Sequence, residues 1–154
     1  MIAKPASASF TEMNEYVLPQ HANALGTVFG GQIMAWVDLC GAICAQRHSG
    51  LFAVTAFVDD LKFVGPIEVG QVAHIRGRVT ATFRTSMELE IIVEGEDART
   101  GRRWPCVSAF LTFVAVEPST KKPVPVPALL LDTPDAKATQ AAGEKRREER
   151  LKKS

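Results

Sequence analysis

The sequence predicts an α+β domain in which one long central helix is wrapped by a curved antiparallel sheet of about five strands. Residues 30–47 are apolar on nearly every side, which is typical of a buried helix. One strand is expected before this helix and four after it, because the later segments favour strands and two of them alternate apolar and polar residues. A single sheet cannot cover every side of such a helix, so a second copy of the chain is expected to cover the rest.

Changes in composition divide the chain into three parts. Residues 1–9 are expected to form a flexible N-terminus, residues 10–127 the folded domain, and residues 128–154 a charged, weakly ordered C-terminal tail. Five prolines within residues 117–135 predict an extended segment on the surface. Glycine and proline end most of the expected strands, which are residues 10–18, 53–64, 71–82, 85–94 and 103–116.

Composition and charge are those of an ordinary globular protein. The net charge of +1 over 154 residues gives no sign of a nucleic-acid partner. The first residues lack the apolar stretch of a signal peptide, and no apolar run approaches the roughly 20 residues of a membrane span. The three cysteines have neither the spacing of a disulfide framework nor nearby histidines for zinc. We therefore expect a cytoplasmic protein with no metal, no nucleic acid and no membrane insertion.

Asp38 is the one acid or base between Gly30 and Arg47 in the expected helix. A buried carboxylate without a partner is costly. Either Asp38 serves chemistry, or it forms a structural ion pair with a distant base such as Lys62 or Arg47. In the first case, the carboxylate would act as a general base or as a nucleophile.

The polar loop before the helix holds further candidates. The amide of Asn23 can orient water or bond a carbonyl, or it can cap its own loop. Gly30 and Gly31 allow close approach of a neighbour, and free N–H groups at a helix start suit a developing negative oxygen. His21 is a solvated loop residue, a contact for the substrate, or an acid–base partner of Asp38.

This loop and helix start resemble the signature of the hotdog-fold acyl-coenzyme A thioesterases, which are cytosolic hydrolases of acyl-CoA. The pattern Asn-x-x-Gly-x-x-Phe-Gly-Gly runs from Asn23 to Gly31, and Asp38 follows seven residues later. The likeness continues through residues 63–70, 84–86 and 112–116, and it covers residues 10–127.

The resemblance implies a hotdog fold and a homodimer with a continuous sheet, commonly assembled as a hexameric trimer of dimers. It implies that the acyl-CoA substrate lies in the dimer interface, with coenzyme A as part of the substrate and product instead of a cofactor. Asp38 would be the catalytic base or nucleophile, and Asn23 would act with it from the partner subunit. The backbone of Gly30 and Gly31 would polarise the thioester carbonyl.

The same resemblance assigns coenzyme contacts to Arg84, Thr85 and Ser86, at the start of an expected strand. The residue before this arginine is often glycine in the family and is Phe83 here. A guanidinium beside two hydroxyl groups suits phosphate and pantetheine oxygens. Without the resemblance, the three residues are equally well described as a solvated turn.

Two alternatives keep the fold and change the function. A 3-hydroxyacyl thioester dehydratase acting on acyl-carrier-protein substrates would use His21 with Asp38 as an acid–base pair. A non-catalytic acyl-CoA sensor would bind the same ligand and release no thiol. The sequence favours an acyl-CoA hydrolase of fatty acid metabolism, because a carboxylate beside the thioester is of no use to a sensor.

Overall fold

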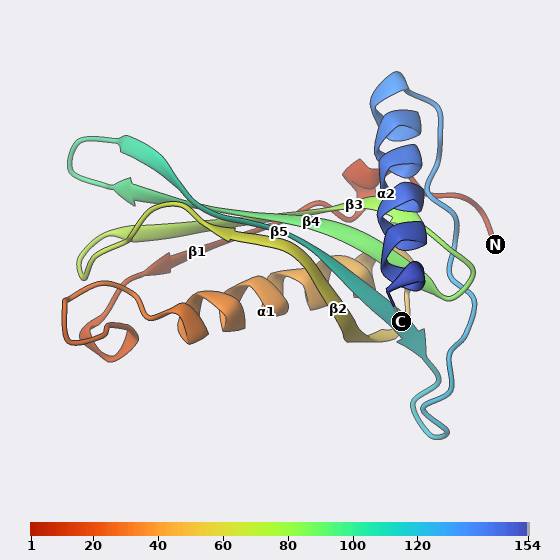
Figure 1. Ribbon diagram of the computed structural model, residues 1–154, viewed down its shortest axis with the longest axis horizontal. Helices are drawn as coiled ribbons and strands as arrows, with labels where there is room; N and C mark the ends of the chain where they lie inside the picture. Colours follow the sequence, from red (N-terminus) through yellow and green to blue (C-terminus); the bar gives the residue numbers. More distant parts are fainter. Residues whose placement is uncertain (154) are drawn as a thin grey trace.

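Five strands form one antiparallel sheet in the order β1-β3-β4-β5-β2, which leaves β1 and β2 at its edges. In the computed structural model, which describes residues 1–153, the long helix α1 (Gly30–Ser49) connects these two edge strands (Figure 1). The expected helix and all five expected strands are confirmed, with ends shifted by at most three residues. The strands are β1 (Thr11–Tyr16), β2 (Phe52–Phe63), β3 (Val72–Thr82), β4 (Ser86–Asp97) and β5 (Arg102–Val116).

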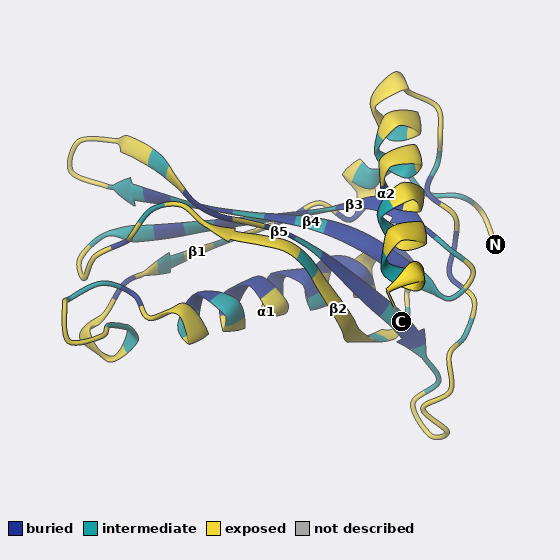
Figure 2. Cartoon of the chain, in the orientation of Figure 1, coloured by how far each residue is buried: buried dark blue, intermediate teal, exposed yellow. Residues whose placement is uncertain are grey.

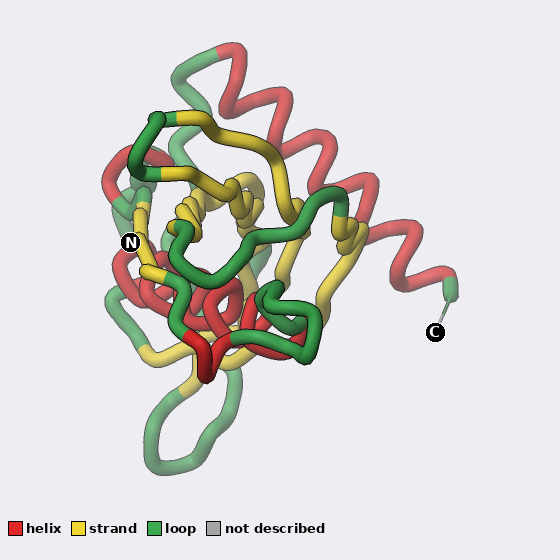
Figure 3. Tube along the Cα trace, turned by 90° about the vertical axis from the view of Figure 1, so that its left-hand side faces the viewer, coloured by secondary structure: helices red, strands yellow, loops and turns green. Residues whose placement is uncertain are grey.

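Helix α1 packs one face against the concave side of the sheet, as the view along it shows (Figure 3). Contact is close because of Gly41, where a Cβ atom would lie 2.6 Å from the Phe113 ring. The three cysteines are buried and free in this core. Burial raises the pKa of the Cys40 thiol to about 12 and that of Cys106 to about 11, so both stay protonated at neutral pH.

The other face of α1 is not covered by this chain, which corrects the expectation of burial on every side. Leu39 is 55% exposed and Ile43 is 38% exposed, and Asp38 lies on the same exposed face. The edge strand β2 is also exposed along most of its length (Figure 2). Apolar surface of this kind on a helix and an adjacent sheet edge is typical of an interaction surface.

Both ends of the described chain are ordered, whereas the sequence predicts flexible or weakly ordered ends. A short 3-10 helix, η1 (Ala6–Ala8), and a bridge between Lys4 and Leu129 hold the N-terminal residues against the extended segment. That segment is extended as expected, but Val126 and Leu129 are buried instead of lying on the surface. A second short 3-10 helix, η2 (Pro19–His21), follows β1.

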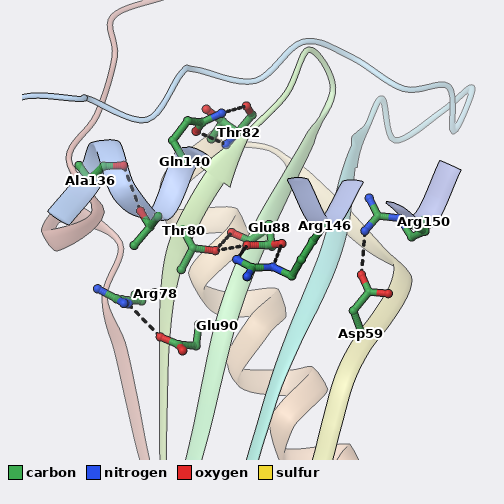
Figure 4. A network of polar contacts seen from close by, with 11 residues as sticks. Asp59, Arg78, Thr80, Thr82, Glu88, Glu90, Ala136, Gln140, Arg146 and Arg150 are labelled. Carbon is green, nitrogen blue, oxygen red and sulfur yellow. Dashed lines mark hydrogen bonds and ion pairs between the residues drawn. The ribbon is translucent and has the colours of Figure 1, made fainter. Parts of the chain in front are cut away.

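The C-terminal tail is a regular helix, α2 (Pro134–Lys152), and the expectation of weak order is wrong. Thr133 caps its first turn, with the hydroxyl accepting a bond from the Ala136 N–H at 3.0 Å. The helix crosses the outer face of the sheet (Figures 1 and 4). Glu88 on β4 is therefore only 2% exposed, and it accepts two bonds from Arg146, both 2.8 Å long.

No helix in residues 1–153 is long and apolar enough to cross a membrane.

His48 is fully buried near the end of α1 and carries a pH-dependent contribution to stability. Its Nε2 atom lies 2.8 Å from the Pro127 carbonyl oxygen, while Nδ1 has no hydrogen-bond partner among the described residues. Burial is the main cause that lowers the pKa of His48 below its ordinary value of 6.5. Below that pH the unfolded chain binds a proton that the folded chain resists, so protonation of His48 favours unfolding.

We expect the free energy of unfolding to fall as the pH drops below about 6.5, and to fall less in His48→Gln. Urea unfolding at pH 7.5 and pH 5.5 measures both slopes. His21→Gln, which makes the same substitution at a histidine outside the core, is the control for the replacement itself. Equal slopes for His48→Gln and the wild type would show that His48 is not the responsible group.

Candidate functional site

The loop before α1 is folded tightly around the side chain of Asn23. Its Oδ1 atom accepts bonds from the N–H groups of Leu25 and Thr27, at 2.9 and 3.2 Å. Its Nδ2 atom donates to the Thr27 hydroxyl at 2.9 Å. An amide nitrogen has two hydrogens, and among the described residues only one of them is used. Within one chain Asn23 therefore caps its own loop, and its exposed side chain keeps one donor free.

Two separate pieces of the sequence signature meet at this loop. The N–H of Val28 donates to the Ile67 carbonyl at 2.8 Å, and the N–H of Val69 donates to the Gly26 carbonyl at 3.1 Å. Gly26 has a positive φ of 81°, which glycine adopts without strain. Residues 63–70 therefore support the shape of the loop and the position at which α1 begins.

The first turn of α1 is open. Phe29 is the N-cap residue, and no side chain caps the free N–H groups at this end. A Cβ atom would lie 3.8 Å from the nearest neighbour at Gly30, and 3.4 Å at Gly31. These are ordinary packing distances, and neither glycine has a positive φ. Nothing in the packing of a single chain therefore demands glycine at these two exposed positions.

Asp38 lies on the exposed face of α1, about two turns from the helix start. Its Oδ1 atom accepts a short hydrogen bond from the Thr55 hydroxyl of β2. Among the described residues it forms no ion pair, so pairing with Lys62 or Arg47 is wrong for this chain. Arg47 instead donates to the Phe10 carbonyl at 3.2 Å.

Thr55 is a candidate site residue that the sequence did not reveal. It lies in a strand rich in β-branched residues, where one more threonine carries no signal. The regular pairing of β2 with β5 is broken between Thr55 and Phe57. Simple alternation along β2 therefore does not tell which face Thr55 occupies.

His21 is held away from acid–base chemistry with Asp38. Its Nδ1 atom accepts a bond from the Leu18 N–H at 3.0 Å. Its ring packs edge-on against Trp36, with the centroids 5.1 Å apart. These contacts fix the ring in the loop, and no hydrogen bond joins it to Asp38 among the described residues.

Arg84, Thr85 and Ser86 lie at the opposite end of the sheet from Gly30. The β3–β4 turn that holds them lies at the end of the sheet that α2 crosses, as Figure 1 shows. There the Val126 N–H donates to the Arg84 carbonyl at 3.0 Å. The length of α1, about 30 Å, separates the two groups. The expected coenzyme contacts and the expected oxyanion site are thus not brought together within one chain.

A family model described as the thioesterase superfamily matches residues 25–101, which include Asp38 and Thr55. The chain belongs to the thioesterase superfamily. It is similar to an apo, hexameric acyl-CoA thioesterase, with a TM-score of 0.93 and 36% identity over 99% of this chain and 97% of that one. The predicted hotdog fold is thereby confirmed.

Two further relatives of this superfamily member carry activity in their names. An acyl-CoA hydrolase of Staphylococcus aureus, solved with butyryl-coenzyme A, coenzyme A and coenzyme A disulfide, has a TM-score of 0.88 and 30% identity, covering 98% of this chain and 92% of that one. Variants of the same enzyme replace an aspartate, an asparagine and a threonine by alanine. The acetyl-coenzyme A thioesterase of Rattus norvegicus is 36% identical over 139 residues, which span 90% of this chain but only 25% of that protein.

Proposed function

We propose that this protein hydrolyses acyl-CoA thioesters to free coenzyme A and a carboxylic acid. The observation that carries the proposal is Asp38, an ion-pair-free carboxylate on an exposed helix face, oriented by the Thr55 hydroxyl. It lies about two turns from an uncapped helix start. A base and a group of oxyanion donors are the two parts that thioester hydrolysis requires.

In this mechanism Asp38 removes a proton from water as the water attacks the thioester carbonyl carbon, or it attacks that carbon itself. The carbonyl oxygen takes up negative charge and accepts a bond from the Gly31 N–H at the positive end of α1. The carbon–sulfur bond then breaks, and the coenzyme A thiolate leaves and gains a proton. If Asp38 attacks directly, water then hydrolyses the acyl–Asp38 anhydride, which releases the carboxylic acid and restores the carboxylate. The absence of a side chain at Gly30 leaves room for the ester.

Thr55 holds Asp38 in the orientation that this attack needs. The three replaced positions of the Staphylococcus aureus enzyme are separated by 15 and 17 residues, which are the separations of Asn23, Asp38 and Thr55 here. The same residue types at the same spacings support a shared role for these three side chains.

We further propose that the complete site needs a second subunit. The exposed face of α1 and the exposed edge of β2 lie together, and covering both would join two sheets at their β2 edges. Asn23 of the partner subunit would then use its free amide hydrogen toward the substrate. Arg84, Thr85 and Ser86 would hold coenzyme A from another subunit, since they are far from Gly30 in their own. Hexameric relatives support a trimer of such dimers.

A thiol-release assay over short, long, branched and aromatic acyl-CoAs tests the activity. The proposal predicts release of coenzyme A from at least one class, at a rate that Asp38→Asn lowers. Loss of water from 3-hydroxyacyl thioesters without thiol release would support the dehydratase, although the contacts of His21 with Leu18 and Trp36 disfavour it. Tight binding of acyl-CoA without thiol release over hours would support a sensor.

A further inference from the structure

Helix α2 packs on the outer face of the sheet and contacts its strands one after another. Gln140 exchanges two hydrogen bonds, 2.9 and 3.0 Å long, with the backbone of Thr82 at the end of β3. Two turns later, Arg146 binds Glu88 on β4 with two 2.8 Å bonds, and its guanidinium lies 3.7 Å from the Phe110 ring of β5. The helix is thus fixed to three strands before it reaches the edge strand, and Figure 4 shows the bonds to Thr82 and Glu88.

The last turns of α2 hold β2 through Arg150. Its guanidinium donates to Asp59 at 2.7 Å and lies 4.7 Å from the centroid of the Phe57 ring. The Arg150 side chain is only 13% exposed and the Asp59 side chain 27%, so the pair is largely shielded from water. A shielded ion pair with good geometry holds two elements together more firmly than an exposed pair does.

Strand β2 is irregular in the region that Arg150 contacts. Its pairing with β5 shifts between Thr55 and Phe57, and again between Asp59 and Lys62. Asp60, at the second irregularity, has a positive φ of 50°. Only the short stretch from Phe57 to Asp59 pairs regularly between the two shifts. A bulge sets which face of the sheet the following residues occupy, so contacts that hold Phe57 and Asp59 also act on the bulge before them.

The first bulge places neighbouring side chains of β2 on opposite faces of the sheet. Thr55 bonds Asp38 of α1 on the inner face, whereas Phe57 contacts Arg150 of α2 on the outer face. In a regular strand, residues two apart share one face. The extra residue at the bulge, Ala56, is what allows both contacts at once.

We propose that Arg150 is a positioning residue for the reaction: by holding Phe57 and Asp59, it fixes the bulge that turns Thr55 toward Asp38. This inference rests on the proposed function, because it assigns a distant residue to the same carboxylate. If the bulge moves by one residue, Thr55 faces away from α1 and Asp38 loses its donor. Misplacing a catalytic group by about 1 Å can cost about one-hundredfold in rate.

The test measures kcat and KM for thiol release in the full-length Arg150→Met variant. Methionine keeps an unbranched apolar side chain against Phe57 and removes the ion pair. We expect kcat to fall roughly tenfold to one-hundredfold, with little change in KM, and Arg150→Lys to recover part of it. Asp59→Asn breaks the same pair from the other side and should show the same loss. Lys145→Met removes an exposed positive charge from the same helix and should keep the wild-type kcat.

The effect of Arg150→Met in a Thr55→Val background shows whether Arg150 acts by positioning Thr55 or only by stabilising the fold. In a Thr55→Val background, Arg150→Met should change kcat by less than about twofold, because the donor it positions is already gone. An unchanged kcat in Arg150→Met and Asp59→Asn, an equal loss in both backgrounds, or a loss that follows dissociation of the assembly in gel filtration would overturn the proposal. The effect of Asp38→Asn judges the proposed function independently, since that variant leaves Arg150 in place.

Discussion

Replacing Asp38 by asparagine is expected to lower kcat for thiol release by about 10²- to 10⁴-fold, the range typical of a lost general base. Asparagine has the same shape and still accepts the Thr55 hydrogen bond, so the fold and the orientation of this side chain are kept. It cannot take a proton from water or form an acyl intermediate as a carboxylate does. Steady-state assays with the best acyl-CoA substrate measure the loss.

Asp132→Asn is the matched control, because it makes the same change at an exposed acid outside the site. It should retain the wild-type kcat. Binding of coenzyme A to Asp38→Asn, followed by calorimetry, should stay within about threefold of the wild type, since the carboxylate acts on the reacting carbon more than on the coenzyme. A full kcat in Asp38→Asn would remove Asp38 from the mechanism.

Glu88→Ala is expected to lower the free energy of unfolding by about 3 kcal/mol, because it leaves a largely buried Arg146 without its partner. The Glu88 carboxylate also accepts a 2.6 Å bond from the Thr80 hydroxyl, which loses this acceptor as well. Urea unfolding measures the stability. Limited proteolysis should show earlier cleavage within α2, because this pair anchors the middle of the helix to the sheet.

The double variant Glu88→Leu with Arg146→Met removes the ion pair but keeps side chains of similar volume in its place. It therefore distinguishes an unpaired buried charge from a loss of packing. Apolar replacement of both partners is expected to recover most of the lost stability, since no buried charge is left unpaired. Wild-type stability in Glu88→Ala would show that the ion pair does not hold α2 in place.

The strands and the central helix were predictable because their signals are local. In β3, Ala73, Ile75 and Val79 alternate with histidine and arginine, and these apolar residues are indeed buried in the core with α1. Glycine or proline marks the ends of most elements. The loop from Asn23 to Gly31 is a candidate site for a different reason, because its pattern of residue types is specific.

Helix α2 was not predictable from apolar periodicity because it packs without large apolar side chains along most of its length. A Cβ atom at Gly143 would lie 2.4 Å from the Ala81 Cβ, so the helix approaches the sheet at a glycine. Three arginines of the helix stack on phenylalanine rings, and other side chains bond the strands directly. In the sequence, such a helix looks like a solvated run of charges.

The environment of Asp38 was not predictable either. Residues 30–47 are apolar enough to suggest burial on every side, yet one chain covers only one side of the helix. The role of Thr55 depends on a bulge, and a bulge leaves no mark on composition. The surroundings of Asp38 and the position of Thr55 both depend on contacts between segments far apart in the sequence. The exposed side of α1 also depends on whether a second chain covers it.

The most direct test of the central claim is to mix two inactive variants, Asp38→Asn and Asn23→Ala, and let their subunits exchange. If each site combines Asp38 of one subunit with Asn23 of its partner, every mixed dimer contains one intact site, and the mixture regains about a quarter of the wild-type activity. If both residues act within one chain, every site in the mixture carries a defect. Activity that stays at the level of the separate variants, after exchange is verified by mass spectrometry, would contradict a site shared between two subunits.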